Sequence, residues 1–139
     1  MFLNPGTHAA NRFDAQRLIA TRHSFRFFGL VFILPGVIGS NMPASFATFA
    51  AYGDFATGVL AILALLSTRI RPLFWSFVVA FNLTGATDII SITTTPFRLA
   101  LDVMPGQFGA TYAIPIIYAP LLMITHVDAF YLLVRRVSQ

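Results

Sequence analysis

Four long apolar segments follow one another along this chain, and they constrain its fold more than any other feature. A hydrocarbon core of about 30 Å takes on the order of 20 helical residues to cross. The segments near 25–42, 46–68, 73–95 and 109–134 are of this kind. Because 57% of the 139 residues are apolar and only 10% are charged, the chain has too little polar surface for a water-soluble domain. The sequence therefore predicts an all-α integral membrane protein, built as a four-helix bundle.

The first segment is the weakest of the four. Its apolar run contains Gly29, Pro35 and Gly36, and Arg26 near its start has to snorkel to the interface if the segment is to span. A cleaved signal peptide is an alternative, because a basic stretch precedes the apolar run. That stretch is too long for the start of a signal peptide, which favours a retained crossing.

The arginines predict the orientation of the bundle. Four crossings place all nine arginines except Arg98 on one side of the membrane. By the positive-inside rule, both termini are then expected in the cytoplasm. The net charge of +4 has the same explanation, so the expected partner is the lipid bilayer and not nucleic acid.

Residues 1–24 are predicted to form a basic segment ahead of the four-helix domain, 25–139. Phe13, Leu18 and Ile19 are interleaved with arginines there, a pattern typical of a helix that lies on the membrane surface. A solvated helical extension of the first crossing is an equally good interpretation.

Four polar residues inside the predicted helices are the main functional candidates: Asp54, Asn82, Asp88 and His126. A side chain that can ionise at bilayer depth costs several kcal/mol unless it is paired or hydrated, so it suggests function. Asp54 shares a helix face with the small residues Ala50, Gly58 and Ala61. Because stripes of small residues mark close helix packing in membranes, Asp54 is expected to point into the bundle.

Depth sorts these candidates into two layers. At a rise of about 1.5 Å per residue, Asp54 and Asp88 fall at similar depth in an outer layer, with Tyr112 or Tyr118 as a third member. Two carboxylates this close in low dielectric do not both ionise unless a cation joins them. Such a layer suits a cation, a small ligand or a proton relay. The alternative is that both acids only hydrogen-bond neighbouring helices.

The inner layer consists of Asn82 and His126, which fall level with each other. A single imidazole bonded to an amide needs no ligand, so a purely structural role is an alternative for His126. No metal site is predicted, because the three histidines fall in the N-terminal tail, at the inner interface and in the fourth helix. The sequence assigns no cofactor.

The composition also excludes several kinds of chemistry. The chain has no lysine and no cysteine, which excludes Schiff-base formation, thiol nucleophiles and disulfides. It has no serine-nucleophile elbow and no phosphate-binding glycine loop. Whether the protein is an enzyme is left open by the sequence.

The polar residues and the glycines and prolines near them also resemble the motifs of a group of known proteins. The chain resembles an uncharacterised group of small bacterial four-helix membrane proteins, which share three motifs: Gly53-Asp54, Asn82-x-x-Gly85-x-x-Asp88 and Pro115-x4-Pro120-x5-His126. This resemblance implies four helices and the bacterial inner membrane, without a function. More loosely, the turn Thr68-Arg69-Ile70-Arg71-Pro72-Leu73 is similar to DoxX-like proteins, which implies an accessory role in a membrane redox complex.

Three functions follow as expectations. The first is a buried polar pocket that binds a small ligand, a hydrophobic one included, or a cation, or relays protons. The second is an intramembrane enzyme acting on a lipid or quinone, which requires a cavity of roughly 300 Å³ or more. The third is a scaffold or subunit of a membrane complex. The oligomeric state is left open, and a homo-oligomer is one expectation.

Overall fold

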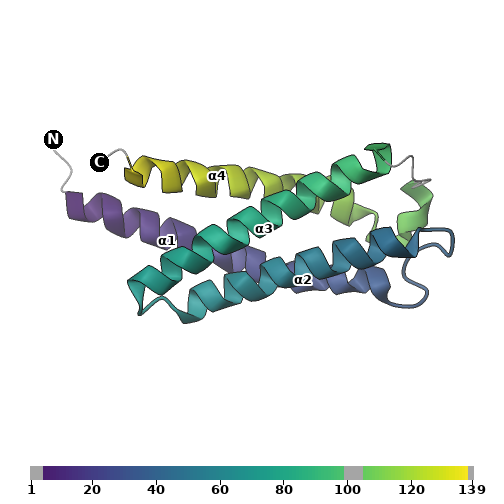
Figure 1. The fold of residues 1–139 in the computed structure, drawn as a ribbon, viewed down its shortest axis with the longest axis horizontal. Coiled ribbons are helices and arrows are strands. Elements are labelled where there is room, and N and C mark those ends of the chain that lie inside the picture. Colours follow the sequence, from purple (N-terminus) through teal and green to yellow (C-terminus); the bar gives the residue numbers. More distant parts are fainter. Residues whose placement is uncertain (1–4, 99–104, 138–139) are drawn as a thin grey trace.

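The computed structural model describes residues 5–98 and 105–137, and the regular elements in these ranges are helices. In chain order they are α1 (Pro5–Ser24), the 3-10 helix η1 (Phe25–Ile33), α2 (Ala44–Leu66), α3 (Arg71–Arg98), the 3-10 helix η2 (Pro105–Thr111), the π-helix η3 (Ile114–Tyr118) and α4 (Ala119–Val137). The start of α1, the turn between α2 and α3, and the end of α4 lie at one end of the molecule (Figure 1). The all-α prediction is confirmed.

Three stretches of the described chain are long and apolar enough to cross a membrane: Ala44–Leu66, Arg71–Thr94 and Ile114–Arg135. They correspond to the second, third and fourth predicted segments. The first predicted segment, 25–42, differs, because its helix ends at Ile33. Leu34 is extended ahead of Pro35, as a residue before proline prefers, and Gly36 has a positive φ of 77°. These residues break the helix that the apolar run predicted.

The N-terminal segment is helical and leads directly into η1. Helix α1 packs against α2 and α4, and Figure 1 shows it running beside α4. Gln16, Ala20 and His23 on its inner face are fully buried. The segment is thus a helical extension that leads into η1, but it is packed against the other helices and not solvated as that interpretation expected.

Helix α2 lies against both α3 and η1, and two apolar clusters form along it. Phe46, Ala47, Ala50 and Ala51 near its start belong to one cluster, and Ala61 and Ala64 near its end belong to the other. Asp54 falls between the two groups. Its neighbours on the predicted small-residue face are buried with it, so Asp54 points inward as expected.

The 3-10 geometry of η1 decides which of its residues face α2. Its buried residues are Arg26, Gly29 and Phe32, at a spacing of three. A 3-10 helix has about 3.0 residues per turn, so these three residues lie on one line along the helix. At Gly58 of α2, an added Cβ would lie 3.1 Å from the backbone nitrogen of Phe27, so a small residue is needed where the two backbones approach.

Candidate functional site

Arg26 lies at the centre of the site, and its side chain is only 1% exposed. Its Nε donates a hydrogen bond to Oδ1 of Asp54 at 2.6 Å, and its Nη2 donates to Oδ2 of Asp88, also at 2.6 Å. The prediction that Arg26 snorkels to the interface is therefore wrong. Two carboxylates inside the protein offer it short, charge-assisted hydrogen bonds, and an arginine fork suits planar carboxylates well.

His126 and Asn82 complete the hydrogen-bond chain. Nη1 of Arg26 lies 3.3 Å from Nε2 of His126, and Nδ1 of His126 lies 2.9 Å from Oδ1 of Asn82. The amide nitrogen of Asn82 donates to the carbonyl of Val78, so its oxygen is left to accept from His126. Because guanidinium only donates, His126 is neutral, with its proton on Nδ1. We refer to Arg26, Asp54, Asn82, Asp88 and His126 as the polar centre.

Three glycines leave space for the side chains of the polar centre. A Cβ added to Gly29 would collide with Asp54, and one added to Gly53 would collide with Asp88. A Cβ at Gly85 would lie 2.5 Å from Nε2 of His126 and 2.6 Å from Nη1 of Arg26. Two of these glycines belong to the motifs noted in the sequence, so those motifs pair polar residues with the glycines that accommodate them.

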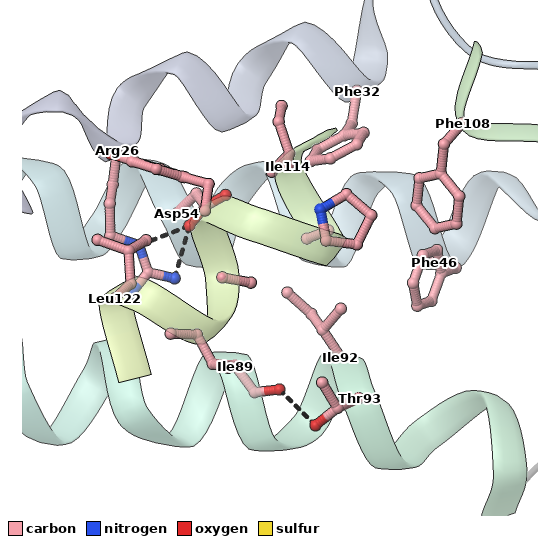
Figure 2. A pocket seen from close by; sticks show the side chains of 14 residues that line it. Arg26, Phe32, Phe46, Asp54, Ile89, Ile92, Thr93, Phe108, Ile114 and Leu122 are labelled. Carbon is pink, nitrogen blue, oxygen red and sulfur yellow. Dashed lines mark hydrogen bonds and ion pairs between the residues drawn. The ribbon is translucent and has the colours of Figure 1, made fainter. Parts of the chain in front are cut away.

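A cavity of about 60 Å³ adjoins the polar centre. In Figure 2, Arg26 and Asp54 lie at one end of it, and Phe46 and Phe108 lie at the other. Phe108 packs edge-on against Phe46, with ring centroids 6.5 Å apart. Thr93 and Tyr118 add hydroxyl groups to its lining, which is otherwise apolar apart from Arg26 and Asp54.

A larger, more open groove of about 360 Å³ lies between η1 and the segment from Ala113 to Leu121. Asp54 and Tyr118 line both this groove and the smaller cavity. Arg26 binds Oδ1 of Asp54, whereas Oδ2 lies beside Gly29, another residue of the groove wall, and receives no hydrogen bond from any residue in 5–98 or 105–137. This oxygen is available to accept a hydrogen bond from a ligand.

The structure thus brings together all four polar candidates from the predicted helices, and adds Arg26 to them. It separates the two tyrosines, because Tyr118 lines the groove whereas Tyr112 is 43% exposed and lines neither cavity. In the part of the chain that the structure describes, no group of three or more histidine and acidic residues is placed to hold a metal ion.

His23 is a further buried residue beside the polar centre that the sequence placed at the inner interface. Its ring lies 4.1 Å from the ring of His126, and its Nε2 lies 2.9 Å from the hydroxyl oxygen of Thr125. That hydroxyl donates to the carbonyl of Leu122, so it accepts from His23. The helical spacing of Gln16, His23 and Arg26 along one face is the signal that would have predicted their common burial.

Comparison with known proteins gives one match. A family model described as a domain of unknown function, DUF8737, matches residues 1–134. No curated protein and no solved structure matches the chain.

Proposed function

We propose a function for this chain, which belongs to DUF8737, a family whose description assigns no function. We base it on the polar centre and the groove beside it. The proposed function is the binding of a small amphipathic molecule that enters the groove from the lipid phase. Its apolar body lies along the groove, and its head donates a hydrogen bond to Asp54.

The observation that carries this proposal is the position of the Asp54 carboxylate. One oxygen is held by Arg26, and the other is available at the wall of a groove that is otherwise almost entirely apolar. Ligand sites in proteins are typically apolar clefts of about 300–1,000 Å³ with a few placed polar groups. The groove of about 360 Å³, with Asp54 and the Tyr118 side chain in its wall, fits this description.

Arg26 favours this function over the binding of a metal cation. Its guanidinium occupies the position between Asp54 and Asp88 that such a cation would need. A purely structural role fits less well, because the polar residues do not satisfy one another completely. Oδ1 of Asp88 is buried and has no hydrogen-bond partner among the described residues.

An intramembrane enzyme acting on a lipid or quinone is a second candidate, which the size of the groove favours. His126 lines neither cavity, so it would not touch a substrate there. In an enzyme of this kind, Asp54 and Tyr118 would be the groups within reach for acid–base chemistry. The accessory role implied by the DoxX-like turn stays a prediction.

Substitution of Asp54 tests the binding function. We expect decanol to form a one-to-one adduct with the detergent-purified protein in native mass spectrometry, and Asp54→Asn to weaken this adduct severalfold, because an amide oxygen is a weaker acceptor than a carboxylate. The matched control is Asp128→Asn, since Asp128 is exposed on α4. Equal decanol binding by both variants would contradict a head-group contact at Asp54.

We also propose that the chain sits in the bacterial inner membrane as a four-helix bundle with both termini in the cytoplasm. The arginine distribution and the common end of α1, the α2–α3 turn and α4 support this orientation (Figure 1). The two cytoplasmic termini follow from an even number of crossings, with α1 and η1 contributing the first.

Single cysteines test this orientation, because the natural chain has none. In intact bacterial cells, a membrane-impermeant maleimide is expected to label Ser40→Cys, in the loop after η1. It should label Ile70→Cys, in the α2–α3 turn, only after lysis. Both positions are exposed in the structure. The reverse labelling pattern would contradict the proposed orientation.

A further inference from the structure

The polar centre contains one more negative group than positive groups. Arg26 carries one positive charge, and Asp54 and Asp88 bring two carboxylates to the same guanidinium. If both carboxylates are ionised, the net charge of the three side chains is −1. An uncompensated charge away from water is very costly, so the site requires either a proton or a further cation.

The other groups around the polar centre do not supply that cation. His126 accepts a hydrogen bond from Arg26 at Nε2 and is neutral. His23 donates to Thr125 through Nε2, and its Nδ1 has no partner among the described residues, which indicates that it too is neutral. Arg22, one helical turn before Arg26, forms no ion pair with either carboxylate in the described chain.

The accessible oxygen of Asp54 is where a cation from outside could bind. Arg26 shields Oδ1, but Oδ2 lies at the wall of the apolar groove between η1 and the Ala113–Leu121 segment. A compact inorganic ion would find only this one carboxylate oxygen among mainly apolar residues. A cation attached to an apolar body would match both the charge and the groove.

We propose that the molecule bound in the groove is an organic monocation, an alkylammonium with an apolar body, whose charge balances the excess negative charge of Arg26, Asp54 and Asp88. This inference rests on the binding function proposed above and names the class of ligand. The ammonium donates to Oδ2 of Asp54, while the alkyl body contacts Phe28, Ile117 and Leu121 in the groove.

The experiment compares three probes with the same alkyl chain: decylammonium, decanol and decanoate. Each is titrated calorimetrically at pH 7 into the full chain in a non-ionic detergent, so that no charged membrane surface concentrates the amine. Decylammonium is expected to bind at least about tenfold more tightly than decanol, because a charge pair in a partly buried site is strong. Decanoate is expected not to bind.

Asp88→Asn is the decisive variant. It removes one negative charge but leaves Asp54 in the groove wall and paired with Arg26. The variant is expected to reduce the advantage of decylammonium over decanol to less than about twofold. Asp54→Asn also removes one negative charge and should abolish the advantage. Asp128→Asn, on the exposed face of α4, should keep it.

The outcomes separate this inference from the function on which it rests. Equal affinity for decylammonium and decanol in the unmodified chain would overturn the monocation inference and leave the binding function standing. If Asp88→Asn still binds decylammonium more tightly than decanol by the full original factor, the inference is also overturned, because the net charge would then not select the ligand. Failure of all three probes to bind would overturn both proposals.

Discussion

Replacing Arg26 by alanine is expected to lower the free energy of unfolding by on the order of 3–5 kcal/mol. The substitution leaves the carboxylates of Asp54 and Asp88 in the interior without their common counter-charge. Removing one partner of a buried ion pair is far more damaging than removing a whole pair. The thermal unfolding of detergent-purified protein, followed by the loss of its size-exclusion peak, measures the effect.

Arg17→Ala is the matched control. Arg17 pairs with Asp14 on the same helix, but the Arg17 and Asp14 side chains are 52% and 64% exposed. An exposed pair of this kind contributes about 0–1 kcal/mol, so little change is expected. In addition, combining Arg26→Leu with Asp54→Asn and Asp88→Asn should recover most of the lost stability. A triple variant as unstable as Arg26→Ala would show that charge imbalance is not the cause.

Gly29→Ala is expected to destabilise the protein by about 1–3 kcal/mol, the range for overpacking a closely packed interior. The new methyl group would collide with the Asp54 side chain, including its Cβ, which rotation of the side chain cannot move out of the way. The same displacement should weaken decanol binding, because Asp54 forms part of the groove wall. Thermal unfolding and native mass spectrometry measure the two effects on one sample.

Gly106→Ala provides the comparison for this prediction, since no atom of residues 5–98 or 105–137, apart from those of its own local backbone, lies within 4 Å of where its Cβ would be placed. It should match the unmodified chain in both measurements. A Gly29→Ala protein with unchanged stability and unchanged decanol binding would show that η1 and α2 are not as tightly packed there as the structure indicates.

The grouping of Asp54, Asn82, Asp88 and His126 could be predicted because these residues lie on regular α-helices. On such helices, a fixed rise and a fixed number of residues per turn convert sequence position into depth and direction. The contact between His126 and Asn82, two residues expected at one level, is present in the structure. These positions did not predict what the cluster binds.

Tyr112 shows where this reasoning fails. Its predicted place in the outer layer assumed an unbroken α-helix from 109 to 134, whereas the structure contains the 3-10 helix η2 and the π-helix η3 before α4 begins at Ala119. Each of these elements has a different number of residues per turn from an α-helix. Upstream of Ala119, the α-helical spacing therefore no longer predicts which way a side chain faces. Within α4 it does, since Leu122, His126 and Ala129 are all buried.

Charge balance could have predicted that Arg26 lies between the two aspartates. Two aspartates at one depth call for a cation, the chain has no lysine, and Arg26 is the only arginine inside a predicted crossing. A regular α-helix would spread Arg26, Gly29 and Phe32 over about 120° of its circumference, whereas the 3-10 conformation places them on one line.

The 3-10 conformation of η1 also changes how far this segment reaches. A 3-10 helix rises about 2.0 Å per residue and an α-helix about 1.5 Å. The nine residues of η1 therefore extend about 18 Å, compared with about 13.5 Å for the same residues in an α-helix. Winding η1 into an α-helix would shorten it by about 4.5 Å and rotate Gly29 and Phe32 away from α2. In the four-crossing topology proposed above, this longer rise would let a short apolar run cover more of the bilayer thickness.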